Sequence, residues 1–214
     1  AEIGEGPGGL HCTAPRLTGR EISLSLPSVG ATENIMLCAC GAQGTTTIVN
    51  AAREPEIADL QDFLNALGAK VRGAGSSTIL IEGGRALHGG EHTVIGDRIV
   101  AATYLAAAAA AGGDVSVRGV DWRHLSTVTS VLREAGCDVR SGKGSVRLTC
   151  AAPLRGVRPI HTAPYPGFPT DAQAPLMAAL ASAAGTTVFV ENMFESRYRH
   201  VDELTRMGAD IRVE

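Results

Sequence analysis

The sequence predicts an α/β fold built from three copies of one unit, in which a strand, a helix, a strand and a helix precede a strand pair. Two recurring glycines predict the repeat. One ends a helix in each copy, at Gly68, Gly136 and Gly208. The other opens a β-branched stretch, at Gly44, Gly113 and Gly185. Because two independent landmarks keep nearly the same spacing, we infer a common unit.

The first half of the first copy shows the pattern. Residues 21–26 alternate between polar and apolar side chains, which predicts a strand. The turn at 27–30 leads into an apolar helix from residue 31 to about residue 40. Residues 45–50 are β-branched and form the next predicted strand.

The copy closes with a second helix and a hairpin. Pro55 within an acidic first turn predicts the start of the helix, and Gly68 predicts its end. Residues 71–73 and 78–82 flank a small polar turn, as the two strands of a hairpin do.

The other copies are expected from about His92 to Thr149 and from Pro159 to Glu214, where a first terminal strand begins. Residues 10–12 resemble the closing strand of an earlier copy. These boundaries predict a piece of a longer chain. Its open edges predict self-association, or pairing with the missing segments.

Composition excludes several classes of protein. With 44% apolar but only 4% aromatic residues, the core must consist of small and branched aliphatic side chains. A net charge of -3 without a basic block argues against nucleic-acid and membrane-surface partners. The most apolar stretch, 99–111, is too short to span a bilayer. Five cysteines without disulfide spacing, and no signal peptide, predict a cytoplasmic protein.

Three strand-to-helix junctions occupy equivalent places in the copies. They are residues 27–30, 96–98 and 169–171. The N-terminus of a helix binds anions well, which would make these junctions ligand sites. Alternatively Ser28, Asp97, and Thr170 or Asp171 cap their own helices. The spacing alone leaves both interpretations open.

The segment 162–171 is the least ordinary one. Pro164, Pro166 and Pro169 impose an extended path that places Asp171 at the start of a helix. A rigidly held carboxylate suits a general base, and the same segment suits a stiff crossover. The six histidines lack metal-ligand spacing, so no metal is expected.

Several long, ordered segments carry a family resemblance. They are residues 27–36, 50–57, 67–75, 96–98, 168–171, 193–198 and 203–209. On these segments the sequence resembles the UDP-N-acetylglucosamine 1-carboxyvinyltransferases, the enolpyruvyl transferases that open bacterial peptidoglycan synthesis. The resemblance extends over nearly all 214 residues but only about the middle half of a typical family chain.

The resemblance implies an inside-out α/β barrel of the enolpyruvyl transferase type, made of two similar domains with three units each. Residues 1–95 would be the later part of the first domain, and residues 96–214 the first part of the second. Substrate would bind in the cleft between domains.

Site residues follow from the same resemblance. The segment Leu26-Pro27-Ser28-Val29-Gly30 matches the one that contacts the diphosphate of the nucleotide sugar. Leu26 stands where some members have Lys. Asp97 and Arg98 match cleft residues near the domain junction.

The third copy matches the part of the family site at the sugar. Asp171 matches the carboxylate that meets the sugar 3-hydroxyl and is the expected general base. Met193 matches a residue whose backbone contacts the nucleotide sugar, and Phe194 packs beside it. Arg197 matches an active-site arginine on the same rim.

The implied reaction transfers enolpyruvyl from phosphoenolpyruvate to the 3-hydroxyl of UDP-N-acetylglucosamine and releases phosphate, without a metal or organic cofactor. The loop with the catalytic cysteine or aspartate and the arginines for phosphoenolpyruvate match segments outside these residues. We therefore expect the 214 residues alone to be inactive.

Two alternatives remain at this point. One is 5-enolpyruvylshikimate-3-phosphate synthase, which has the same fold and chemistry but does not share the segments 28–32 and 50–56. The other is a truncated, non-catalytic binding or interaction module.

Overall fold

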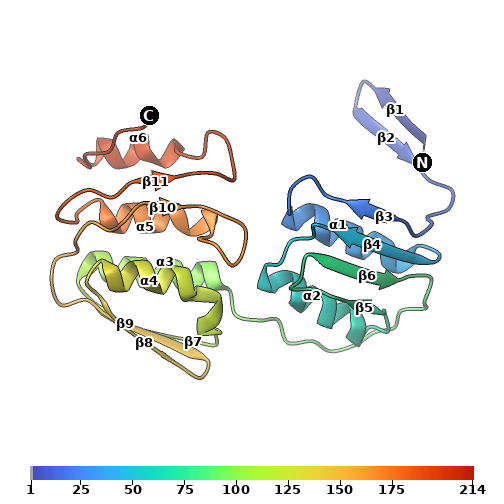
Figure 1. Cartoon of the computed structure of the whole chain (residues 1–214), viewed down its shortest axis with the longest axis horizontal. Coiled ribbons are helices and arrows are strands. Elements are labelled where there is room, and N and C mark those ends of the chain that lie inside the picture. Colours follow the sequence, from blue (N-terminus) through green and yellow to red (C-terminus); the bar gives the residue numbers. More distant parts are fainter. Residues whose placement is uncertain (1) are drawn as a thin grey trace. The chain divides into compact units, whose positions relative to one another are not determined.

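The computed structural model describes residues 2–214 (Figure 1). The chain divides into two compact units, Ala1–Val94 and Ile95–Glu214. The division lies one residue from the boundary expected at 95/96. That the two units are parts of two enolpyruvyl transferase domains stays a prediction, and each unit is described by itself.

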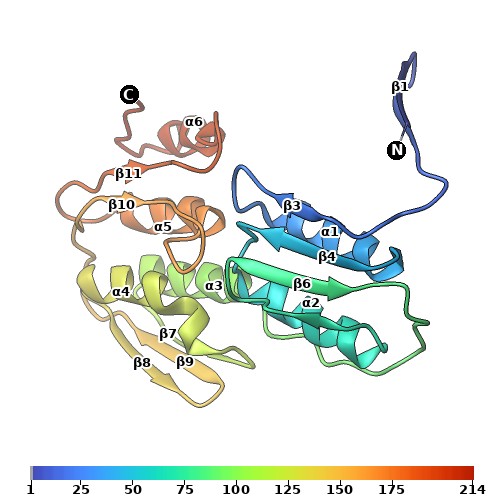
Figure 2. The same cartoon turned by 45° about the vertical axis from the view of Figure 1, so that its right-hand side comes forward.

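The first unit consists of a hairpin and a helix-covered sheet. The hairpin pairs β1 (Glu2–Gly6) with β2 (Gly9–Thr13). The sheet has the order β3 (Glu21–Ser23), β4 (Thr45–Val49), β6 (Thr78–Glu82), β5 (Val71–Arg72), with only β3 and β4 parallel. Helices α1 (Val29–Gly41) and α2 (Pro55–Ala66) lie on one face of it (Figure 2). Met36, Ile48, Ile57, Ile79 and Ile81 are fully buried between the layers.

Strand β3 is shorter than the predicted 21–26. The Leu24 N–H still donates to the Val49 carbonyl at 3.0 Å, but the Leu24 carbonyl accepts from Asn50 Nδ2 at 2.9 Å. Asn50 has a φ of 58°, which lets its side chain turn back onto the strand end. The hydrogen-bond ladder between β3 and β4 therefore ends at Leu24, and the chain continues into the junction before α1.

The second unit begins with α3 (Arg98–Ala111) and an antiparallel sheet. The sheet has the order β7 (Asp114–Arg118), β9 (Ser145–Thr149), β8 (Asp138–Gly142). A short η1 (Trp122–Leu125) and α4 (Ser126–Glu134) connect β7 to β8. The buried face of α3 is mostly alanine, so neighbouring elements approach it closely.

One prediction for this copy is wrong. The unit was expected to open with a strand near His92, yet residues 83–97 form no strand in the structure. His92 instead binds Asp59 of α2 through Nε2 and Oδ1 at 2.9 Å, beside the Phe63 ring. At Gly96 the chain passes so close to Gly119 that a Cβ would lie 2.0 Å from its carbonyl oxygen. A side-chain contact and close backbone packing, rather than strand pairing, thus hold this segment.

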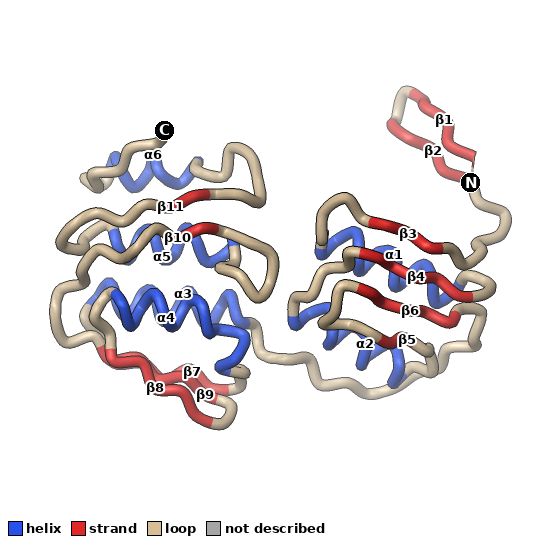
Figure 3. The backbone as a smooth tube through the Cα atoms, viewed as in Figure 1, coloured by secondary structure: helices blue, strands red, loops and turns tan. Residues whose placement is uncertain are grey.

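The third copy contains short strands. Strand β10 (Ile160–His161) pairs in parallel with β11 (Phe189–Val190), and η2 (Thr170–Ala172) runs into α5 (Gln173–Leu180) (Figure 3). Helix α6 (Arg199–Arg206) follows. Residues 209–214 form no strand, so the terminal strand expected there is not observed.

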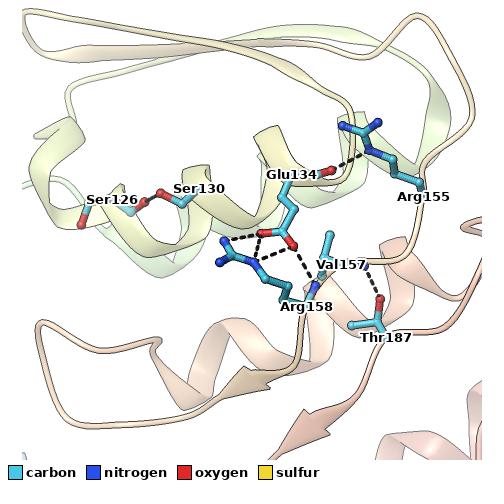
Figure 4. A network of polar contacts seen from close by, with 7 residues as sticks. All are labelled: Ser126, Ser130, Glu134, Arg155, Val157, Arg158 and Thr187. Atoms are coloured by element: carbon cyan, nitrogen blue, oxygen red, sulfur yellow. Dashed lines mark hydrogen bonds and ion pairs between the residues drawn. The ribbon is translucent and has the colours of Figure 1, made fainter.

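A polar network connects the second copy to the third (Figure 4). The Glu134 carboxylate, at the end of α4, accepts from the Arg158 N–H at 2.7 Å and from its Nη2 at 2.9 Å. Arg155 Nε donates to the Glu134 carbonyl at 2.9 Å. The Val157 N–H donates to Thr187 Oγ1 at 3.0 Å, which fixes the approach to β10. The network therefore sets the position from which the third copy starts.

Among the described residues no helix combines the length and the apolarity that crossing a membrane requires. The same residues contain no group of three or more side chains suited to hold a metal ion.

Candidate functional site

The first junction belongs to the first unit, where Ser28 caps α1. Ser28 Oγ accepts from the Ala31 N–H at 3.3 Å, and the Thr32 hydroxyl donates to the Ser28 carbonyl at 2.8 Å. Thr32 is fully buried and accepts the Ala52 N–H at 3.0 Å, which fixes the junction to the loop after β4. Leu26 beside it is 70% exposed. For Ser28 the capping interpretation is confirmed.

The fold does not require a glycine at position 30, in the first turn of α1. A Cβ at this position would meet no atom within 4 Å, and its φ is not positive. Glycine inside a helix costs about 1 kcal/mol relative to alanine. The first N–H groups of a helix, here those of Val29 and Gly30, have no intrahelical acceptor. This turn therefore presents backbone donors beside open space.

The second junction also caps its helix. Asp97 Oδ1 accepts the N–H groups of Ile99 and Val100 at 2.7 and 2.9 Å. Arg98 is buried, and its guanidinium carbon lies 5.8 Å from the centre of the Tyr165 ring. The structure thus joins Arg98 to the proline-rich segment of the third copy, a link that the sequence did not indicate.

The third junction differs from the other two. Pro169 stands at the N-cap position of η2, and no side chain there caps the helix. Asp171 instead forms an ion pair with Arg197, whose guanidinium carbon lies 4.9 Å from the centre of the Phe194 ring. The capping interpretation is therefore wrong for Thr170 and Asp171. Two predicted catalytic residues, 26 positions apart, are brought into contact.

The extended path predicted for the proline-rich segment is wrong, because the segment folds back on itself before it reaches Asp171. The Ala163 N–H donates to the Phe168 carbonyl at 3.0 Å, and the Gly167 N–H donates to the Pro164 carbonyl at 2.8 Å. Phe168 is buried in the core of the second unit. The loop is thus a closed, anchored turn that leaves the Asp171 side chain 55% exposed.

Met193 and Phe194 lie in a turn held by Glu191, a residue that the sequence analysis missed. Glu191 Oε1 accepts the N–H groups of Met193 and Phe194 at 2.8 and 3.2 Å. A ligand that contacts the backbone of Met193 therefore meets its carbonyl oxygen, because the N–H is already engaged. One signal could have identified Glu191: it follows a β-branched stretch directly, where a strand ends.

The charge state of Glu191 follows from its surroundings. Partial burial acts to raise its pKa, but hydrogen bonds from the Met193 N–H, the Thr170 and Thr162 hydroxyls and the Phe194 N–H outweigh burial. The pKa of Glu191 is therefore lower than its ordinary value, and the side chain is ionised at neutral pH.

The predicted residues thus fall into two groups. The second unit holds Asp97, Arg98, Asp171, Met193, Phe194 and Arg197. Within it, Asp171, Arg197 and Phe194 form one contiguous cluster, and Met193 adjoins it through the Glu191 turn. The segment Leu26-Pro27-Ser28-Val29-Gly30 belongs to the first unit.

Comparison with protein families gives one match over nearly the whole chain. Residues 3–214 match the family model described as EPSP synthase (3-phosphoshikimate 1-carboxyvinyltransferase).

Curated relatives carry a more specific name. UDP-N-acetylglucosamine 1-carboxyvinyltransferase 2 of Caldanaerobacter subterraneus is 50% identical over 213 residues, which cover 100% of this chain and 51% of the relative. UDP-N-acetylglucosamine 1-carboxyvinyltransferase 1 of Symbiobacterium thermophilum is 53% identical over 100% of this chain and 48% of the relative. The chain thus spans about half the length of these relatives.

Solved structures support the fold that the sequence predicts. The enolpyruvyl transferase NikO from Streptomyces tendae matches with a TM-score of 0.84 and 27% identity, over 98% of this chain and 52% of that one. An EPSP synthase from Acinetobacter baumannii matches with a TM-score of 0.58 and 25% identity, over 88% of this chain and 45% of that one. The predicted inside-out α/β fold of the enolpyruvyl transferases is confirmed.

Proposed function

Because the chain belongs to the EPSP synthase family of carboxyvinyltransferases, we propose that the natural gene product that contains it transfers enolpyruvyl from phosphoenolpyruvate to the 3-hydroxyl of UDP-N-acetylglucosamine. The acceptor is chosen from the relatives that share about half of its residues and bear that name. The solved EPSP synthase shares only 25%. Phosphate is the second product.

The observation that supports the chemistry is the Asp171–Arg197 pair. Asp171 is the exposed carboxylate of a junction that does not use it as a cap, and Arg197 fixes its orientation. In the proposed reaction Asp171 removes the proton of the sugar 3-hydroxyl while that oxygen bonds to C2 of phosphoenolpyruvate. A general acid protonates C3. Loss of phosphate, with loss of a proton from C3, then restores the double bond.

The first unit would supply a binding site for the diphosphate. The N–H groups of Val29 and Gly30 open α1, where the helix dipole favours an anion. Gly30 supports this proposal, since the fold leaves room for a side chain that a ligand close to the backbone would exclude. We also propose that Asp97 and Arg98 contribute to substrate binding in the second unit.

This function would place the protein in the cytoplasm, at the first committed step of peptidoglycan synthesis, and thus in cell-wall growth, cell shape and division. Five free cysteines support a reducing compartment.

The test measures phosphate release by the natural gene product with phosphoenolpyruvate and each of two acceptors. We expect release with UDP-N-acetylglucosamine and background with shikimate 3-phosphate. The opposite preference would assign the protein to the second acceptor. Calorimetric binding of UDP-N-acetylglucosamine without turnover would support a non-catalytic binding module instead.

A further inference from the structure

Glu191 connects parts of the third copy that are distant in sequence. Its Oε1 accepts a hydrogen bond from the hydroxyl of Thr162, directly after β10, at 2.9 Å. Its Oε2 accepts the hydroxyl of Thr170 at 2.8 Å, and Thr170 directly precedes Asp171. Thr162 is 1% exposed, so this end of the network is rigidly enclosed. Glu191 therefore holds the chain immediately before the Asp171 carboxylate.

The same carboxylate holds the other side of the ion pair. The Met193 and Phe194 N–H groups donate to Oε1 at 2.8 and 3.2 Å. The Phe194 ring, positioned by this turn, lies against the Arg197 guanidinium. One side chain thus fixes both the segment that carries Asp171 and the turn that carries Arg197.

We propose that Glu191 is a positioning residue for the transfer reaction, which holds the Asp171 carboxylate and the Arg197 guanidinium in one arrangement before substrate binds. The inference rests on the proposed function. A carboxylate that only closed the turn at Met193 and Phe194 would need no bond to Thr170, which lies 21 residues earlier. That bond is the feature that extends its role to Asp171.

The first experiment is Glu191→Gln in the natural gene product. Glutamine keeps the size, but its amide group presents N–H donors where one carboxylate oxygen accepted hydrogen bonds. We expect kcat to fall about 10- to 100-fold, since a displacement of about 1 Å can cost that much. The matched control is Glu203→Gln, which removes an exposed carboxylate of α6 that pairs with Arg206. An unchanged kcat in Glu191→Gln would overturn the proposal.

The same substitution in an Asp171→Asn protein separates an effect on positioning from an effect on stability. Because Glu191 acts through Asp171, Glu191→Gln should lower kcat by less than about twofold in an Asp171→Asn protein. A residue that merely stabilised the fold would lower activity by the same factor in both backgrounds, which would contradict the proposal. Thr170→Val tests the link without altering the turn, and Thr170→Ser should restore kcat. A Thr170→Val protein with normal kcat would also overturn it.

The outcomes are distinguishable from failure of the proposed function, which an inactive wild-type protein would indicate. In that case crystal structures of the wild-type and Glu191→Gln proteins decide the inference. A separated Asp171–Arg197 pair in the variant supports it, and an intact pair refutes it.

Discussion

The junctions of the first and third copies occupy the same place in the repeat but use their polar side chains differently. In the first, Ser28 bonds to a backbone N–H of its own helix. In the third, Asp171 at the helix start bonds to Arg197 instead, and Pro169 takes the cap position without a side-chain bond. The difference shows that a repeat can keep its architecture while the polar side chain at one helix start is not used as a cap, and we propose that this side chain takes part in the reaction.

Because Asp171 does not cap its own helix, other parts of the third copy must hold its side chain. A capping side chain is held by the helix that it caps, whereas Asp171 depends on a partner 26 positions away and on a turn closed by Glu191. Among the described residues the Ser28 side chain bonds only within its own helix. Substitution of the polar side chain should therefore affect different properties at the two junctions: activity at Asp171, and local stability at Ser28.

The largest expected effect is that of Asp171→Asn. It keeps the shape of the side chain and removes the base, so we expect kcat in the natural gene product to fall about 100-fold or more. The affinity for UDP-N-acetylglucosamine, measured by calorimetry, should change far less, because other segments supply most of the proposed contacts.

The control for Asp171→Asn is Asp202→Asn, which removes an exposed carboxylate on α6. Near-normal turnover in Asp171→Asn would remove this residue from the mechanism. It would also remove the functional distinction between the two junctions.

A smaller loss is expected for Arg197→Lys. Lysine keeps the positive charge but lacks the planar guanidinium that both pairs with Asp171 and lies against Phe194. We expect kcat to fall about 10-fold, as a misplaced side chain near the reacting group would cause. The exposed Arg206→Lys is the matched control. Equal kinetics for Arg197→Lys and wild type would show that only the charge matters.

The repeat and most of its elements could be predicted because turn glycines and hydrophobic periodicity are local signals. The strand expected near His92 was wrong because a strand needs a pairing partner, and the His92–Asp59 contact holds that segment by other means. Capping at Ser28 and Asp97 was among the predicted alternatives.

The Asp171–Arg197 contact and the role of Glu191 could not be predicted from local pattern. Both depend on how β10 and β11 align the chain ends that follow them. The resemblance pointed to Asp171 and Arg197 individually. Only the fold shows that they form a pair and that Glu191 joins their segments.

The two capped junctions should differ from each other in local stability. Asp97 accepts two N–H groups at 2.7 and 2.9 Å, whereas Ser28 accepts one at 3.3 Å. Loss of a cap costs about 0.5–2 kcal/mol, so we expect Asp97→Ala near the upper end and Ser28→Ala near the lower end. Native-state hydrogen exchange in α3 and α1 measures each cost separately. Asp97→Asn should remain close to wild type, and a larger cost for Ser28→Ala would contradict the comparison.

Asp121 combines both uses of a junction carboxylate. It caps η1 through the Arg123 N–H at 2.9 Å and also pairs with the Arg123 side chain. The Arg123 side-chain bond, opposed by partial burial and helped by the backbone bond and His124, lowers the pKa of Asp121 to about 2 from an unfolded value of 3.8. The folded pKa lies below the unfolded one, so the stabilisation is complete above about pH 4 and is lost as the pH falls toward 2.

Urea unfolding at a series of pH values should therefore show wild type more stable than Asp121→Asn near pH 5.5, with the difference shrinking below pH 4. A difference that stays constant with pH would mean that Asp121 acts only as a cap, as Ser28 does.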